Sequence, residues 1–236
     1  MMKSFEKFSD SFREAWDLVI DVRYPFAGEE QRDGDPVLRA MLIPFCGCVA
    51  GVLLTALGKL IPAGGAGSLL WALIALFLLD LKDSGRAVKF ISRKISSAIF
   101  KNDSGEFVSA LNVELMLLRL AALFVIVWQY TCGGMIPVLT AVFTVESFLA
   151  VNNPCPIIEL ENRERKFIWL VPAAVAFLSF WSMPLFTVVC VALPAGVVWC
   201  FKKRVWKEDQ PVSGDDITFC AGVVELLLLI CAMTIL

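Results

Sequence analysis

The chain has 236 residues, of which 58% are apolar and 19% charged, and its net charge at pH 7 is −2. Soluble domains carry about a quarter of charged residues, so this composition excludes an ordinary soluble domain and predicts one membrane domain over 1–236. Histidine is absent, which removes the commonest general base and transition-metal ligand, so any metal would have to be held by carboxylates.

The N-terminal region, 1–36, is predicted to contain an amphipathic helix at the membrane surface. It lacks the unbroken apolar core of a signal peptide. Its apolar residues instead recur at helical spacing between charged ones, and they are Phe5, Phe8, Phe12, Trp16 and Val19. We therefore expect this helix to lie flat in the interface.

Apolar runs of about 20 residues predict seven membrane-spanning helices within 38–236. The run over 167–201 is too long for one crossing and is divided near Ser182-Met183-Pro184. The runs over 67–81 and 167–182 are short, so a thinned membrane or a re-entrant pair is an alternative to full crossings. The expected fold is an all-α polytopic membrane bundle with spans over 38–60, 67–81, 107–130, 133–151, 167–182, 184–201 and 218–236.

Lysine and arginine are distributed asymmetrically between alternate loops. Of the 21, six precede residue 40, and 13 more lie in the expected cytoplasmic loops 82–106, 152–166 and 202–217. The intervening loops have none, and only Lys59 and Arg119 fall elsewhere. Because positive residues accumulate on the cytoplasmic side, we expect the N-terminus inside and the C-terminus outside.

The eight cysteines lie mostly inside apolar runs, where cysteine behaves as a small hydrophobic residue. Cys46 and Cys48 are two residues apart in a helical run, so they point to different faces and do not form a CxxC pair. We interpret the cysteines as packing residues.

Two carboxylates end the second expected span. Asp80 and Asp83 are three residues apart, so they share one helix face at its C-terminal end. The helix dipole and their mutual repulsion disfavour this arrangement, and a bound cation would relieve both. Oxygen ligands suit Mg²⁺. The alternative is that Lys82 and Arg86 neutralise them on a solvated helix end.

Two further acidic elements precede spans on the same side. LysAsnAspSerGlyGlu over 101–106 contains Asp103, and SerGlyAspAsp over 213–216 contains Asp215 and Asp216. Aspartate and serine cap helix N-termini, so capping is the plain interpretation of each. Their shared position at the cytoplasmic ends of different spans favours a common site.

Four ionisable residues lie within expected spans, and such residues are candidates for function: Glu114, Arg119, Glu146 and Glu225. At 1.5 Å per residue, the three glutamates lie about 7 to 11 Å from the cytoplasmic helix ends and could line one cavity. Arg119 lies deeper, and its alternative role is an interhelical ion pair that fixes packing.

In order along the chain, these motifs resemble those of the cobalamin synthase family, the adenosylcobinamide-GDP ribazoletransferases. ValArgTyrPro, with Arg23, resembles the family's Thr-Arg-x-Pro element, and Asp80 and Asp83 resemble its acidic block. LysAsnAspSerGlyGluPhe, with Lys101, is similar to a Lys-Asp-Ser element that precedes a long helix. SerGlyAspAsp followed by Glu225 is similar to a Thr-Gly-Asp element and a last helix carrying glutamate.

The resemblance implies a reaction that joins adenosylcobinamide-GDP to α-ribazole or its 5′-phosphate and releases GMP. It further implies Mg²⁺ on Asp80, Asp83 and Asp103, a hydroxyl proton accepted by Asp215 or Asp216, and phosphate oxygens held by Arg23 and Lys101. The location implied is the bacterial cytoplasmic (inner) membrane, with the active site facing the cytoplasm. Lipid is an expected partner, a homo-oligomer is compatible with the chain, and no nucleic-acid partner is expected.

Two other classes of function stay open. The ionisable residues within the spans would suit a transporter, although no inverted repeat of the kind many transporters show is visible. A non-catalytic scaffold related to the family is the other alternative, because apolar Leu76 and Leu78 occupy positions where the family's acidic block has a further Asp and a His.

Overall fold

The computed structural model describes residues 2–19, 35–61, 64–80, 91–93, 95, 105–129, 132–152, 158, 161, 164–204 and 214–236. These residues form α-helices and short 3₁₀ helices and no strand. The elements are α1 (Met2–Val19), α2 (Pro36–Leu60), α3 (Gly65–Asp80), α5 (Gly105–Trp128), η1 (Cys132–Gly134), α6 (Met135–Asn152), η2 (Glu164–Trp169), α7 (Leu170–Ser182), α8 (Pro184–Arg204) and α9 (Gly214–Ile235).

Five helices in the described part of the chain are long and apolar enough to cross a bilayer: α2, α5, α6 with η1, α8 and α9. Two expected spans are shorter helices, because α3 has 16 residues and α7 has 13, preceded by the six of η2. The chain is therefore a multi-pass membrane helical bundle. The predicted total of seven membrane crossings requires that the shorter helices α3 and α7 also cross. The expected break between α7 and α8 is confirmed, since Met183 interrupts the helix and Pro184 begins the next.

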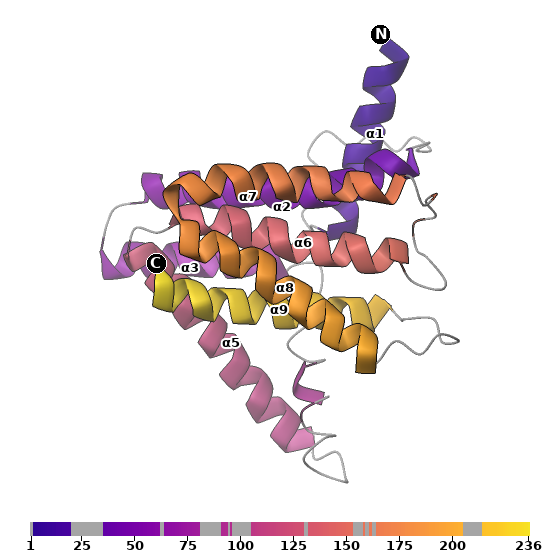
Figure 1. Cartoon of the computed structure of the whole chain (residues 1–236). Coiled ribbons are helices and arrows are strands. Elements are labelled where there is room, and N and C mark those ends of the chain that lie inside the picture. Colours follow the sequence, from indigo (N-terminus) through magenta and orange to yellow (C-terminus); the bar gives the residue numbers. More distant parts are fainter. Residues whose placement is uncertain are drawn as a thin grey trace.

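The long helices run side by side and their ends gather at two ends of the bundle (Figure 1). The charged end carries the starts of α2, η2 and α9 and the ends of α6 and α8. The neutral end carries the ends of α2, α7 and α9 and the starts of α6 and α8. Helix α5 slants away from the other helices towards its N-terminal end (Figure 1).

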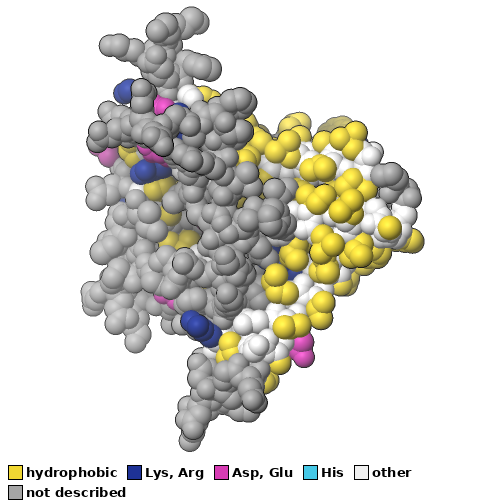
Figure 2. Space-filling view, turned by 180° about the vertical axis from the view of Figure 1, so that it is seen from behind, with side chains coloured by type: hydrophobic (Ala, Val, Ile, Leu, Met, Phe, Trp, Pro, Cys, Tyr) yellow, Lys and Arg dark blue, Asp and Glu magenta, His cyan; other side chains and the backbone are white. Residues whose placement is uncertain are grey.

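Exposed side chains agree with a bundle surrounded by lipid. The described part of the back face is covered by apolar side chains towards the neutral end (Figure 2). Exposed tryptophans occur at both ends, Trp169 and Trp199 at the charged end and Trp128 and Trp181 at the neutral end. Tryptophan is enriched at both membrane interfaces, so these residues indicate the two levels where lipid meets water.

Helices α2 and α6 pack with their backbones in close contact. A Cβ atom added to Gly47 would lie 2.5 Å from the backbone oxygen of Leu139, and one added to Gly51 would lie 2.6 Å from the Cα of Ile136. The two glycines are four residues apart, the spacing at which small residues let membrane helices approach closely. Ser147 adds a hydrogen bond across the contact by donating to the carbonyl oxygen of Ala40 at 2.8 Å.

Helix α1 is helical as expected, and it also packs on the start of α2. It runs across the bundle at the charged end (Figure 1). The ring of Phe12 lies 6.0 Å from that of Phe45, and Glu14 pairs with Arg39 at 3.2 Å. Ser11 accepts a hydrogen bond from the backbone N–H of Asp35, the N-cap residue of α2. The apolar face of α1 is thus partly covered by protein, with Ala15 fully buried.

The seven described cysteines form no disulfide, and four of them are buried. The four buried cysteines pack as the sequence predicted, whereas Cys200 is exposed.

Candidate functional site

A buried ion pair joins α5 to α9 within the bundle. The Arg119 guanidinium donates to Glu225 Oε1 through Nη2 at 2.6 Å and through Nε at 3.0 Å, and both residues are buried. A buried charge is strongly destabilising without its partner, so this contact fixes how α5 and α9 pack. The expected interhelical ion pair of Arg119 is confirmed, and Glu225 is its partner.

A second polar group lies on the same face of α5. Asn112 precedes Arg119 by seven residues, so it lies about 10 Å closer to the helix start and only about 20° around the helix. Its Oδ1 atom is buried and has no hydrogen-bond partner among the described residues. A buried polar atom without a partner is costly in a folded protein and therefore requires an explanation. Nothing in the local sequence distinguishes this residue, and it is the functional candidate that the motifs do not include.

The end of α3 lies level with Asn112. Helices α3 and α5 are in contact, and the start of one lies by the end of the other, because a Cβ on Gly65 would lie 3.7 Å from the ring of Trp128. Asp80 is 15 residues further along α3, about 22 Å at the helical rise, which brings its backbone level with Val113 of α5.

The start of α9 reaches a similar level. Helices α5 and α9 run in the same direction from the charged end, and the Arg119–Glu225 pair fixes their relative height. Asp216 precedes Glu225 by nine residues, about 13 Å, and is therefore level with Ala110. Nine residues also turn a helix by half a turn, so Asp216 lies on the side of α9 opposite Glu225.

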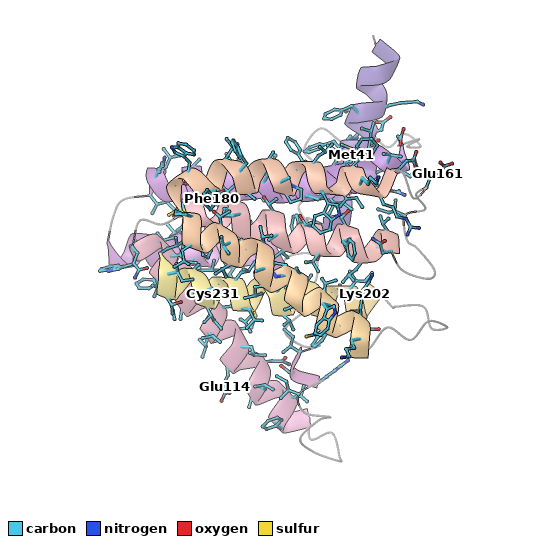
Figure 3. The ribbon with its side chains drawn as sticks, viewed as in Figure 1. Met41, Glu114, Glu161, Phe180, Lys202 and Cys231 are labelled. Atoms are coloured by element: carbon cyan, nitrogen blue, oxygen red, sulfur yellow. The ribbon has the colours of Figure 1, made fainter. Side chains whose placement is uncertain are left out.

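Glu114 does not share the face of α5 that carries Asn112. It is exposed, and the five residues to Arg119 turn the helix by about 140° from the ion pair. Figure 3 shows Glu114 on the side of α5 away from the other helices. Glu146 is half-buried on α6. The expectation that the three glutamates line one cavity is therefore wrong for Glu114, because helix register separates it from Glu225.

The other predicted site residues fall outside what the structure describes. Arg23, Asp83, Lys101 and Asp103 lie outside the described residues, and of Asp80 and Asp215 only the backbone is described. Within the described residues, no group of three Asp, Glu or Cys side chains is placed to hold a metal ion. A magnesium site thus stays a prediction that depends on carboxylates beyond this part.

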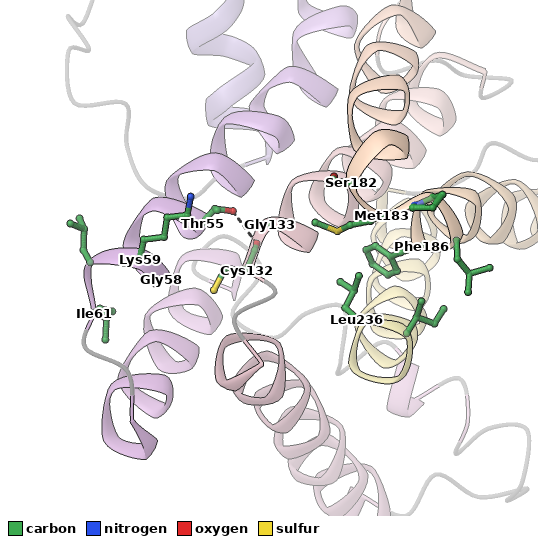
Figure 4. Close-up of a pocket in the computed structure, with 14 residues that line it drawn as sticks. Thr55, Gly58, Lys59, Ile61, Cys132, Gly133, Ser182, Met183, Phe186 and Leu236 are labelled. Atoms are coloured by element: carbon green, nitrogen blue, oxygen red, sulfur yellow. Dashed lines mark hydrogen bonds between the residues drawn. The ribbon is translucent and has the colours of Figure 1, made fainter.

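The neutral end has a cavity of about 910 Å³ that is distinct from this region (Figure 4). It lies between the end of α2, η1, the α7–α8 corner and the end of α9, and Lys59 is the one charged side chain among the described residues that line it. The Thr55 hydroxyl lies within hydrogen-bond distance of the carbonyl oxygens of Gly51 and Cys132. Along α9 the cavity is about 28 Å from Asp216, so the two regions lie at opposite ends of the bundle.

Comparison of the chain with protein-family models, with curated proteins and with solved structures finds no significant match.

Proposed function

We propose that this chain is a membrane-bound phosphoryl-group transferase of the adenosylcobinamide-GDP ribazoletransferase type, acting at the charged end of the bundle. The observation that carries the proposal is Asn112. Its buried, unpartnered amide oxygen lies at the height where α3 ends in Asp80 and α9 begins with two aspartates. Two acidic motifs distant in sequence thus lie at the end of α3 and the start of α9, close to the level of an amide oxygen that has no hydrogen-bond partner among the described residues.

In the proposed reaction, a ribose hydroxyl oxygen of α-ribazole attacks the phosphorus atom nearer the corrinoid. The bond from this phosphorus to the bridging oxygen breaks, GMP leaves with that oxygen, and a carboxylate accepts the hydroxyl proton. The two candidate bases are Asp215 and Asp216, at the start of α9. Carboxylates are the natural choice of base in a chain without histidine.

Oxygen donors fit Mg²⁺, and the candidate set of carboxylates with one carboxamide has that chemistry. Asp80, Asp83 and Asp103 would hold the ion, which supplies neutralisation of the pyrophosphate charge when bound. The oxygen of Asn112 would accept a hydrogen bond from the substrate or join the ligand set. Arg23 and Lys101 would bind phosphate oxygens.

The ion pair of Arg119 and Glu225 has a supporting role in this proposal. Each charge neutralises the other, and the pair holds α5 against α9 further from the charged end than the candidate site. The sequence made these residues the reason to consider a transporter. A buried pair that bridges two helices fits a packing role. This role favours the transferase over the transporter.

The test is release of GMP from adenosylcobinamide-GDP, measured with and without α-ribazole and at several Mg²⁺ concentrations. We expect ribazole-dependent release by the wild type and its loss in Asp80→Asn and Asp83→Asn. Asp10→Asn, which alters a half-buried aspartate of α1 that belongs to none of the motifs, is the matched control and should keep full activity. A folded wild type that releases no GMP would overturn the proposed reaction, whereas active Asn variants would overturn the placement of the site.

Asn112 supplies a second variant that separates catalysis from packing. Asn112→Leu removes a buried polar atom without a partner, so the thermal midpoint should stay the same or rise. The same variant should lose ribazole-dependent GMP release. A variant that keeps full turnover would show that Asn112 has no part in the site.

A further inference from the structure

Helices α6, α7 and α8 enclose a second cavity, which we call the lateral slot, of about 530 Å³. This size lies within the range of ordinary ligand pockets. Many of its lining residues are small or cannot complete a regular helix: Pro137, Ala141, Pro172, Ala173, Ala176, Pro194 and Ala195. Pro194 lies inside α8, where proline removes a backbone hydrogen bond and bends a helix. The slot thus remains open because its walls lack bulk.

The interior of the slot demands an apolar occupant. Its three threonines each donate their hydroxyl proton to a carbonyl oxygen four residues earlier, Thr140 to Ile136, Thr144 to Thr140 and Thr187 to Met183, at 2.6 to 2.8 Å. These hydroxyls therefore have no proton left to donate to a ligand. An occupant with polar atoms deep in the slot would lose its own hydrogen bonds to water, which is unfavourable.

The mouth of the slot lies at the charged end of the bundle and presents aromatic rings and lysines. Phe148 packs on Trp169 with ring centroids 5.6 Å apart, and the Lys202 ammonium lies 5.1 Å from the centroid of Phe148. Trp199 also lines the slot, and the Lys203 ammonium lies over its ring, 5.3 Å from the centroid. Both lysines are exposed, and Figure 3 shows Lys202 at the charged end of α8. The mouth therefore offers positive charge at the level where the tryptophans indicate the interface.

The length of the slot matches one leaflet of a bilayer. From Pro137 to Phe148 on α6 it extends over about 16 Å, and from Thr187 to Trp199 on α8 over about 18 Å. Half of the hydrocarbon core of about 30 Å is about 15 Å. A hydrocarbon chain of this length that enters at the mouth would therefore fill the slot, whose inner end at Pro137 and Thr187 lies within one turn of the starts of α6 and α8.

We propose that the lateral slot binds one hydrocarbon chain of an anionic phospholipid, whose phosphate sits beside Lys202. Charge complementarity selects this occupant, because the slot accepts only hydrocarbon and its mouth presents lysine. Lysine near a membrane surface attracts anionic lipid by about 1 kcal/mol per residue. The site is separate from the proposed transfer reaction, since no slot residue belongs to α3, α5 or α9.

Native mass spectrometry of the chain released from nanodiscs of equal phosphatidylglycerol and phosphatidylcholine tests the proposal. We expect the wild type to retain one phosphatidylglycerol in preference to phosphatidylcholine. Ala195→Phe fills the slot and should abolish retention. Ala192→Phe places the same ring on an exposed position of α8 that does not line the slot, so retention should persist. Ala173→Phe on the α7 wall is a second filling variant, should Ala195→Phe not fold.

A charge pair of variants tests the headgroup. Lys202→Gln should lower the preference for phosphatidylglycerol about fivefold, the factor that corresponds to about 1 kcal/mol. Lys203→Gln, whose residue does not line the slot, should lower the preference less than Lys202→Gln does. Equal retention of both lipids by the wild type, or retained lipid in both filling variants, would overturn the proposal. A dimer that Ala195→Phe dissociates would identify a second copy of the chain as the occupant instead.

Discussion

Helix α6 has two neighbours of opposite character. Towards α2 it meets Gly47 and Gly51, where no space remains for a single added carbon. Towards α7 and α8 it borders the lateral slot, with a volume of about 530 Å³. Both contacts are apolar, so hydrophobicity does not distinguish them. The difference lies in side-chain volume and helix regularity, because glycine at four-residue spacing joins helices whereas proline and alanine leave a gap.

Shape is the main determinant of packing at both contacts of α6, and the largest expected effect lies where charge replaces shape. Arg119→Met leaves the Glu225 carboxylate without this guanidinium inside the bundle and should lower the free energy of unfolding by about 3–5 kcal/mol. The double variant Arg119→Met with Glu225→Met should recover much of this loss. Unfolding in a titration with SDS measures both. If the double variant is less stable than either single variant, the pair stabilises beyond mere neutralisation.

Gly51→Leu should disrupt the tight contact between α2 and α6 directly. The new Cβ would lie 2.6 Å from a backbone atom of α6, so the two helices must separate. We expect a loss of about 3 kcal/mol, the upper part of the range for overpacked cores. The thermal midpoint in detergent should fall accordingly. An unchanged midpoint would show that α2 and α6 adapt at no cost and would remove the contrast with the slot.

Replacing glycine by alanine should change the free energy of unfolding in opposite directions at two positions. Gly47→Ala forces a carbon against the Leu139 carbonyl and should cost about 1–2 kcal/mol. Gly196 lies in α8, where an added Cβ meets nothing within 4 Å. Gly196→Ala should therefore stabilise by about 1 kcal/mol, the difference in helix propensity between the two residues. Melting of both variants in one detergent compares them, and equal signs would contradict the packing difference.

The smallest effect concerns the hydrogen bond across the tight contact. Ser147→Ala removes the donor to Ala40 and should cost about 0.6 kcal/mol, the average for such bonds between membrane helices. The matched variant is Thr144→Val, whose hydroxyl bonds only within α6 and whose loss should cost less. A double-mutant cycle is not needed here, because Ala40 contributes a backbone oxygen. A loss above 2 kcal/mol would make the hydrogen bond, not the glycines, the main contact.

Hydropathy was sufficient to predict the five long apolar helices, because a long apolar run is a local property of the sequence. The break at Met183 followed from a run too long for one crossing and from Pro184. Arg119 could be recognised as half of an ion pair, but its partner Glu225 is 106 residues away, and only the packing of α5 on α9 brings them together. The spacing of Gly47 and Gly51 predicts a close helix contact, yet it does not identify α6 as the neighbour.

The candidate site was harder to predict for a related reason. Asn112 has no sequence signal, since an asparagine in an apolar helix differs from others only in what surrounds its amide. Glu114, two residues later, carries the charge that sequence reasoning favours, but helix register turns it outward. The acidic motifs indicated helix ends, and only the contacts between α3, α5 and α9 relate their heights.

Because protein surrounds α6 in the bundle, its insertion into the membrane during translation depends on which helices have already been made. In its membrane-length window 83% of the residues are buried, and its mean hydropathy of 1.8 is lower than that of the other long helices. Helix α6 tolerates polar residues because it is surrounded mainly by protein, not lipid, in the finished bundle. During translation, however, α7, α8 and α9 do not yet exist when α6 leaves the ribosome. Helix α2 is already in the membrane by then, and its glycine face offers α6 a partner before the rest of its enclosure has been made.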